Sequence, residues 1–73
     1  MNEQELFDLE LKLLVDAIYQ RYHYDFRNYA VSSLRRRMQQ AMQRYDCPRL
    51  SDLQHRLLHE PELFTQAMQF FTV

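Results

Sequence analysis

Residues 24–45 contain the feature that most constrains the fold, an apolar periodicity of about 3.6 residues. On a helical wheel that advances about 100° per residue, apolar side chains collect on one side at i, i+3, i+4 and i+7 spacing. These side chains are Val31, Leu34, Met38, Ala41, Met42 and Tyr45. The pattern predicts a helix over about residues 29–45, with its apolar side buried against other parts of the chain.

The opposite side of this predicted helix carries arginines and no acidic side chain. Residues 27–44 hold five arginines and no Asp or Glu. An ordinary solvated helix mixes the two signs of charge, which gives favourable pairs at i,i+4. We therefore expect this face to bind an acidic partner, although its arginines can instead pair with acidic residues near the N-terminus. The expected contact residues are Arg36, Arg37 and Arg44, flanked by Arg35 and Arg27.

The remaining sequence predicts further helices joined by short connections. Asn2 and Glu5 have the spacing of a capping box, and Pro61 suits the first position of a helix. No strand pattern precedes residues 70–73, which form a β-prone apolar run. The predicted fold is all-α, a compact bundle of three to four short helices over about residues 3–22, 29–45, 51–59 and 61–71.

The first predicted helix is apolar over most of its circumference. Its main apolar face comprises Phe7, Leu11, Leu14, Val15, Ile18 and Tyr22. A second strip beside that face comprises Leu6, Leu9, Leu13 and Ala17. We expect both to contact other helices of the bundle, the alternative being that one strip meets a further domain or a second copy.

The connections require unusual backbone geometry because the chain has no glycine. A left-handed residue commonly ends a helix, so we expect His23 to adopt that conformation after the first helix, the alternative being that the helix unwinds there without it. Tyr24 and Phe26 are expected to pack inward. The expected caps are Asp25 or Asn28 before the second helix and Ser51, with Gln54, at the start of the third.

Length and charge exclude several classes of function. A chain of 73 residues forms one domain at most, and its net charge of −1 gives no general attraction to DNA or anionic lipid. That charge argues against a helix-turn-helix nucleic-acid binder, in which residues 29–45 would be the recognition helix. No apolar run reaches the ~18–20 residues that span a membrane, and the N-terminus lacks a signal pattern. We therefore expect a cytoplasmic protein with no membrane insertion.

The sequence contains no recognisable catalytic or metal-binding constellation. His55 and His59 have i,i+4 spacing, but only Asp52 and Glu62 are near enough in sequence to add ligands. Two solvated histidines are therefore expected. Cys47 lacks a neighbouring histidine and is expected to be an inert thiol. Without glycine the chain cannot form a glycine-rich phosphate loop, so neither catalysis nor cofactor binding is expected of it alone.

Several segments together resemble the N-terminal helical domain of the CheR-type chemotaxis receptor methyltransferases. The matching residues are Ala17–Tyr22, Tyr24–Phe26, Tyr29, Ser32–Met38, Leu53, Leu57–Leu58, Pro61–Leu63 and Phe71–Val73. Arg36 and Arg37 match the family's arginine pair, and Arg44 extends it. The family usually has glycine where His23 stands and often has it near Asp46.

The resemblance implies that residues 1–73 are a single substrate-recognition domain, a fragment of a longer enzyme. That enzyme would methylate glutamates of the acidic helical cytoplasmic region of chemoreceptors. Its S-adenosylmethionine would bind in a catalytic domain that follows in cis. The alternative is a free-standing interaction or regulatory module without catalysis.

Overall fold

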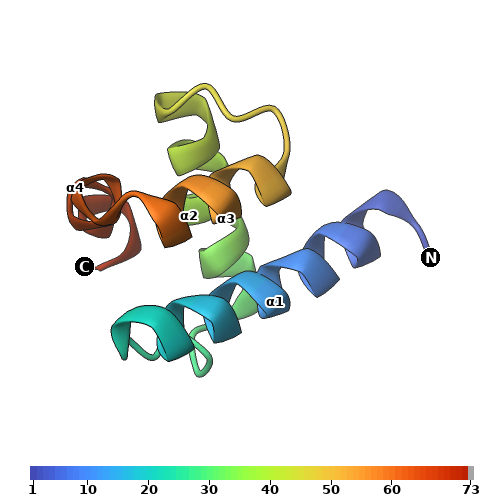
Figure 1. Cartoon of the computed structure of the whole chain (residues 1–73). Coiled ribbons are helices and arrows are strands. Elements are labelled where there is room, and N and C mark those ends of the chain that lie inside the picture. Colours follow the sequence, from blue (N-terminus) through green and yellow to red (C-terminus); the bar gives the residue numbers. More distant parts are fainter. Residues whose placement is uncertain (73) are drawn as a thin grey trace.

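The computed structural model describes residues 1–72, and these residues form four helices and no strand (Figure 1). The helices are α1 (Glu3–Tyr22), α2 (Val31–Arg44), α3 (Leu50–His59) and α4 (Pro61–Phe71). The predicted all-α bundle is therefore confirmed. The β-prone run ends α4 instead of forming a strand, since Phe70 and Phe71 are helical, while Val73 lies outside the described residues.

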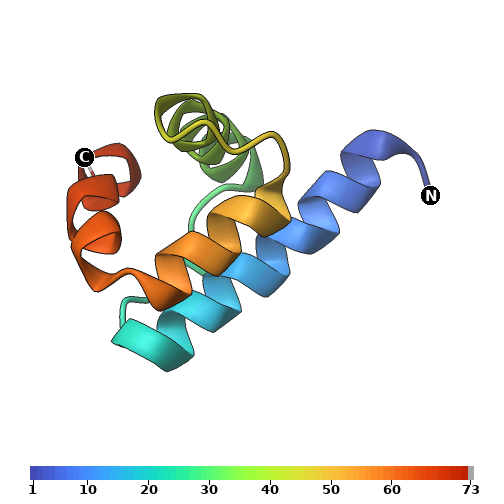
Figure 2. The same cartoon turned by 45° about the horizontal axis from the view of Figure 1, so that its top comes forward.

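The four helices enclose one apolar core. Figures 1 and 2 show α3 lying along α1, whereas α4 lies at the side of the molecule away from the N-terminus. Helix α2 contacts all three other helices. The core comprises Leu11, Leu14, Val15, Ile18, Phe26, Leu34, Met38, Ala41, Cys47, Leu50, Leu53, Leu57, Phe64, Ala67 and Phe71.

Helix α1 begins and buries its main apolar face as predicted. The Asn2 Oδ1 accepts a hydrogen bond from the Glu5 backbone N–H at 2.7 Å, and the Glu5 Oε1 accepts one from the Asn2 N–H at 3.4 Å. This reciprocal pair satisfies two donors that a helix start leaves without intrahelical partners. Leu14 and Ile18 are fully buried, and Phe7 and Tyr22 are half-buried against the core.

The second apolar strip of α1 does not contact the other helices as expected. Leu6, Leu9 and Leu13 are 48%, 42% and 57% exposed. Helices α2 and α3 both pack on the sector of α1 that contains Leu14 and Ile18, so they leave the opposite side uncovered. Only Ala17, at the edge of the strip, is half-buried.

The two turns that lack glycine use left-handed residues. His23 ends α1 with φ 64° and ψ 21°, as predicted, and its N–H donates to the Tyr19 carbonyl at 2.9 Å. Asp46, after α2, has φ 55°. The left-handed region costs any residue with a β-carbon, although His and Asp tolerate it better than most.

The predicted helix caps of α2 and α3 are wrong. Helix α2 begins at Val31 after Ala30, which has no side-chain oxygen to cap it, so neither Asp25 nor Asn28 is the cap. The Asp25 carboxylate instead accepts hydrogen bonds from Arg27. Helix α3 begins at Leu50, one residue before the expected Ser51. There the Asp52 carboxylate accepts a hydrogen bond from the Arg49 N–H at 3.1 Å.

The aromatic residues between α1 and α2 divide between core and surface. Phe26 is buried as predicted, and its ring lies edge-on to Phe71 with centroids 5.9 Å apart. Tyr24, in contrast, is 50% exposed, so its predicted inward packing is wrong. Tyr22 stacks directly on Phe64 with ring centroids 3.9 Å apart, whereas the Tyr24 ring lies farther out, 5.8 Å from Phe64.

Glycine at the left-handed positions is expected to stabilise the domain. The His23→Gly and Asp46→Gly variants each remove a β-carbon from a positive-φ residue, for an expected gain of up to about 1 kcal/mol after the entropy cost of glycine. The matched control is His55→Gly at an exposed position inside α3, where a loss of roughly 0.3–0.5 kcal/mol is expected. Urea denaturation measures the free energy of unfolding of all three variants. Equal losses of stability in His23→Gly and His55→Gly would contradict the expected gain at position 23.

Candidate functional site

The outer face of α2 presents two arginines that have no hydrogen-bond or ion-pair partner in residues 1–72. Arg36 and Arg44 are exposed, and neither makes an ion pair or a hydrogen bond with a described residue. They lie eight residues apart, about 12 Å along the helix axis, with exposed Gln40 midway between them. We call Arg36, Gln40 and Arg44 the free arginine face. The Arg44 guanidinium carbon also lies 5.6 Å from the Tyr45 ring centroid.

Arg35 is held by α1. Its Nε and Nη2 donate to the two carboxylate oxygens of Asp8, at 3.1 and 2.9 Å. Both side chains are about three-quarters shielded, with exposed fractions of 27% and 25%. The hydrogen bonds from Arg35 lower the pKa of Asp8. The pair therefore links α2 to α1, as in the alternative in which arginines pair with acidic residues near the N-terminus.

Arg37 is held by α4 instead of by an acidic residue. Its Nη1 donates to the Phe71 backbone carbonyl at 2.6 Å, one of the carbonyls that the end of a helix leaves unsatisfied. The guanidinium carbon lies 5.8 Å from the Tyr29 ring centroid. One nitrogen of Arg37 is thus used internally, and the contact links α2 to the end of α4.

Arg27 lies outside α2, in the preceding connection. Its Nε and Nη2 donate to the Asp25 carboxylate at 2.9 and 3.0 Å, and its guanidinium carbon lies 3.9 Å from the Tyr19 ring centroid. Hydrogen bonds from the Arg27 side chain and backbone lower the pKa of Asp25 to about 2. Of the five predicted contact residues, the structure thus brings Arg36 and Arg44 onto one free face and gives the other three internal partners.

Arg56 has a structural role that the sequence reading missed. Its side chain is half-buried, and its Nη1 donates to the Tyr45 carbonyl at 3.0 Å. Its Nε donates to Glu60 at 3.1 Å. The i,i+4 spacing of Arg56 and Glu60 is a signal that could have identified the ion pair. The contact between Arg56 and Tyr45 could not be found that way, because it depends on how α3 packs against the end of α2.

The histidines and the cysteine form no metal site in the part of the chain that the structure describes. His55 and His59 are exposed, and their ring centroids lie 4.3 Å apart. No group of three His, Cys, Asp or Glu side chains within residues 1–72 could hold a metal ion. Cys47 is a buried free thiol.

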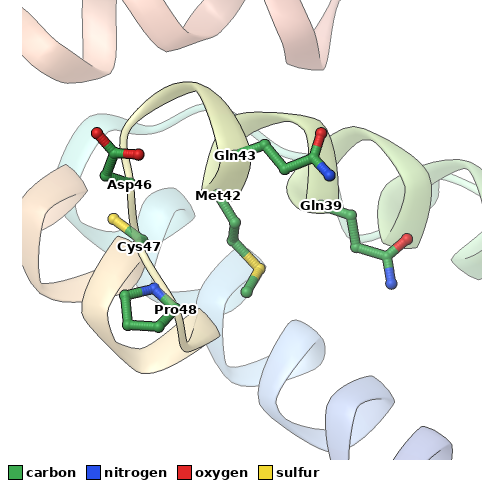
Figure 3. A pocket seen from close by; sticks show the side chains of 6 residues that line it. All are labelled: Gln39, Met42, Gln43, Asp46, Cys47 and Pro48. Atoms are coloured by element: carbon green, nitrogen blue, oxygen red, sulfur yellow. The ribbon is translucent and has the colours of Figure 1, made fainter.

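A hollow opens between the end of α2 and the connection to α3 (Figure 3). The residues that line it are Gln39, Met42, Gln43, Asp46, Cys47 and Pro48. Its polar groups are two amides and one carboxylate, so it offers no positive charge to a phosphate or carboxylate ligand. The free arginine face is therefore the better candidate for recognition of an anionic group.

None of the helices found in residues 1–72 is long and apolar enough to cross a lipid bilayer. The longest, α1, carries charged residues along its length.

The ion pairs predict that the domain loses stability in acid. Guanidinium hydrogen bonds lower the pKa of Asp8, Asp25, Asp52 and Glu60 in the folded state. Their contribution is complete above the unfolded pKa values of about 4 and is lost as the pH falls through the folded values. For Asp25 that interval runs from pH 3.8 down to about 2.

Thermal unfolding followed by circular dichroism should show a falling Tm over this range, and the fall should be smaller in Asp25→Asn. A Tm independent of pH below 4 would contradict the assignment.

Two comparisons with known proteins indicate the same family. The family described as CheR methyltransferase, all-alpha domain, matches residues 9–72. A Pseudomonas putida KT2440 protein named "Putative methyltransferase Cher3" is 44% identical over 73 residues, which is 100% of this chain and 27% of that protein. The chain thus spans about a quarter of the length of this relative. No solved structure gives a significant match.

Proposed function

The chain belongs to the family of CheR methyltransferase all-alpha domains, and on that premise we propose that it recognises the substrate of a protein-glutamate O-methyltransferase. In this proposal residues 1–73 form the single receptor-recognition domain of a longer cytoplasmic enzyme of bacterial chemosensory signalling. The partner is the acidic helical cytoplasmic region of a chemoreceptor. The relative's greater length, of which this chain covers 27%, supports a larger parent protein.

The observation that carries the proposal is that the guanidiniums of Arg36 and Arg44 on α2 make no hydrogen bond or ion pair within residues 1–72. A guanidinium presents a planar fork that fits a carboxylate with two hydrogen bonds. Arg36 and Arg44 lie about 12 Å apart along α2, and acidic side chains seven or eight residues apart on a partner helix lie about 10.5–12 Å apart. A receptor helix with glutamates at that spacing can therefore meet both arginines at once. Gln40, between them, can accept or donate a hydrogen bond at the same surface.

The remaining predicted contact residues have a supporting role in this proposal. Arg35 and Arg37 link α2 to α1 and α4, and so hold the free arginine face in a fixed orientation. Arg37 keeps donors that Phe71 does not use, so it can also touch a bound carboxylate at the edge of the face. Arg27 flanks the start of α2 with its charge already paired to Asp25.

The cofactor that the family implies, S-adenosylmethionine, does not fit the residues described here. The chain has no glycine with which to form a close backbone loop, and the hollow beside α2 is lined by amides, a carboxylate and a thioether. We therefore assign the cofactor and the methyl transfer to a catalytic domain elsewhere in the longer protein. This domain contributes recognition and orientation of the acidic helix.

A peptide titration tests the proposed function. The probe is a helical peptide with glutamates one heptad apart, and its control is the same peptide with glutamine in their place. The chain is expected to bind the glutamate peptide more tightly, and the affinity should fall as salt is added, because exposed charges are screened. Equal affinity for the two peptides would show that the chain does not recognise the glutamate carboxylates.

A further inference from the structure

The side of α1 away from the core carries a regular apolar ridge that no other helix of residues 1–72 covers. We call Leu6, Leu9 and Leu13 the leucine strip, and their exposed fractions are 48%, 42% and 57%. The spacing of three and four residues places the three side chains in one row along the helix. Single exposed leucines are ordinary, but a continuous row of them marks an interaction surface.

Carboxylates border the leucine strip on both sides. On a helical wheel Glu3 and Glu10 lie along one side, and Glu5 and Asp16 lie along the other. None of the four forms an ion pair with a residue of the described chain. Lys12 is the basic side chain nearest this border, so the surroundings of the strip carry a clear negative surplus.

We propose that the leucine strip binds a basic amphipathic helix of a partner protein. Aliphatic side chains of that helix, spaced at i, i+3 and i+7, would cover the strip, and its lysines or arginines would face the bordering carboxylates. A second copy of this chain fits less well, because pairing two strips would bring both sets of carboxylates around one seam. The site lies on a different sector of α1 from the Asp8–Arg35 pair that faces α2, so it is separate from the free arginine face.

Residues 1–72 leave the strip uncovered. Figures 1 and 2 show the C-terminal end on the opposite side of the molecule from the N-terminal half of α1, which contains Leu6 and Leu9. The segment of the chain that the structure describes therefore does not cross the strip after α4.

Two designed peptides test the proposal directly. Both have about 14 residues, or four helical turns, with leucine at i, i+3, i+4 and i+7. One carries lysine at the other positions and its twin carries glutamate. Isotope-labelled chain is titrated with each peptide and followed by NMR, and affinity is measured by fluorescence anisotropy. The lysine peptide is expected to bind and to shift the signals of Leu6, Leu9 and Leu13, and the glutamate twin is expected not to bind there.

Variants separate the strip from general charge attraction. The Leu9→Gln/Leu13→Gln double variant is expected to weaken binding of the lysine peptide by about tenfold or more, because the apolar burial is lost. Both side chains are exposed, so its circular dichroism should match the wild type. The control is Val31→Gln, at an aliphatic position on α2 that is 39% exposed, and it should leave the affinity unchanged. Three results would overturn the proposal: equal losses of affinity in the double variant and in Val31→Gln, NMR shifts confined to residues away from the strip, or self-association of the chain that the double variant abolishes.

Discussion

Reversing both free arginines, in the Arg36→Glu/Arg44→Glu double variant, is expected to weaken binding of the glutamate peptide on the order of a hundredfold. Hydrogen bonds to charged groups contribute about 1.5–3 kcal/mol each when they are shielded from water, and the reversal replaces attraction by repulsion. Neither side chain makes a hydrogen bond or an ion pair within residues 1–72, so the fold should be preserved. Isothermal titration calorimetry measures the affinity, and circular dichroism checks the helix content.

The controls for this variant come from the same chain. Lys12→Glu repeats the charge change of a single Arg→Glu substitution on the exposed surface of α1, and it should change the affinity little. Arg37→Glu should lower the Tm, because it removes the hydrogen bond to the Phe71 carbonyl. If Lys12→Glu weakened binding as much as Arg44→Glu, the effect would reflect net charge and not the α2 face.

In the longer enzyme that we propose, the double reversal should also abolish methylation of the receptor. Affinity for S-adenosylmethionine should stay unchanged, because the cofactor is assigned to another domain. A variant enzyme that still methylated receptors at the wild-type rate would contradict the role of Arg36 and Arg44.

Truncating Phe71 to alanine is expected to leave the domain largely unfolded at 25 °C. The Phe71 side chain is fully buried, and its ring contacts Phe26 from the loop before α2. Removing a buried phenylalanine ring costs about 3–5 kcal/mol. A core of this size supplies roughly the same total, about 3–5 kcal/mol. The expected loss is therefore about as large as the whole free energy of unfolding of the domain.

Matched substitutions make this expectation measurable by urea denaturation. Phe71→Leu keeps much of the apolar volume and should give an intermediate loss, which allows a folded baseline. Phe70→Ala removes the same ring from the neighbouring half-buried position, where it contacts Tyr45, and should cost less. A Phe71→Ala variant that unfolded at the wild-type urea concentration would show that the end of α4 contributes little to the core.

The helices and most of the core could be predicted from residue spacing. The i, i+3, i+4 pattern placed Leu34 and Met38 in the core, and the capping residues Asn2 and Glu5 marked the start of α1. The left-handed backbone of His23 followed from the absence of glycine where a helix had to end. All of these features depend on residues that lie close together in the sequence, so residue spacing is enough to predict them.

The details that failed depend on contacts between distant segments. The exception is the cap of α2, where Asp25 or Asn28 was expected: the helix begins at Val31 after Ala30, and the Asp25 carboxylate binds Arg27, two residues away. The sequence does not distinguish the arginines from one another, but the packing of the helices gives only some of them internal hydrogen-bond partners. Arg35 reaches Asp8 and Arg37 reaches the Phe71 carbonyl, across 27 and 34 residues of chain. Only the assembled bundle shows which guanidiniums remain free.

The most direct test of the central claim is an NMR titration that observes the arginine side chains while the glutamate peptide is added. If α2 binds carboxylates through its free arginine face, the Nε–H signals of Arg36 and Arg44 should shift first and most. The Arg35 signal should move little, because its partner Asp8 is already in place. Binding that left Arg36 and Arg44 unshifted while signals elsewhere moved would contradict the claim.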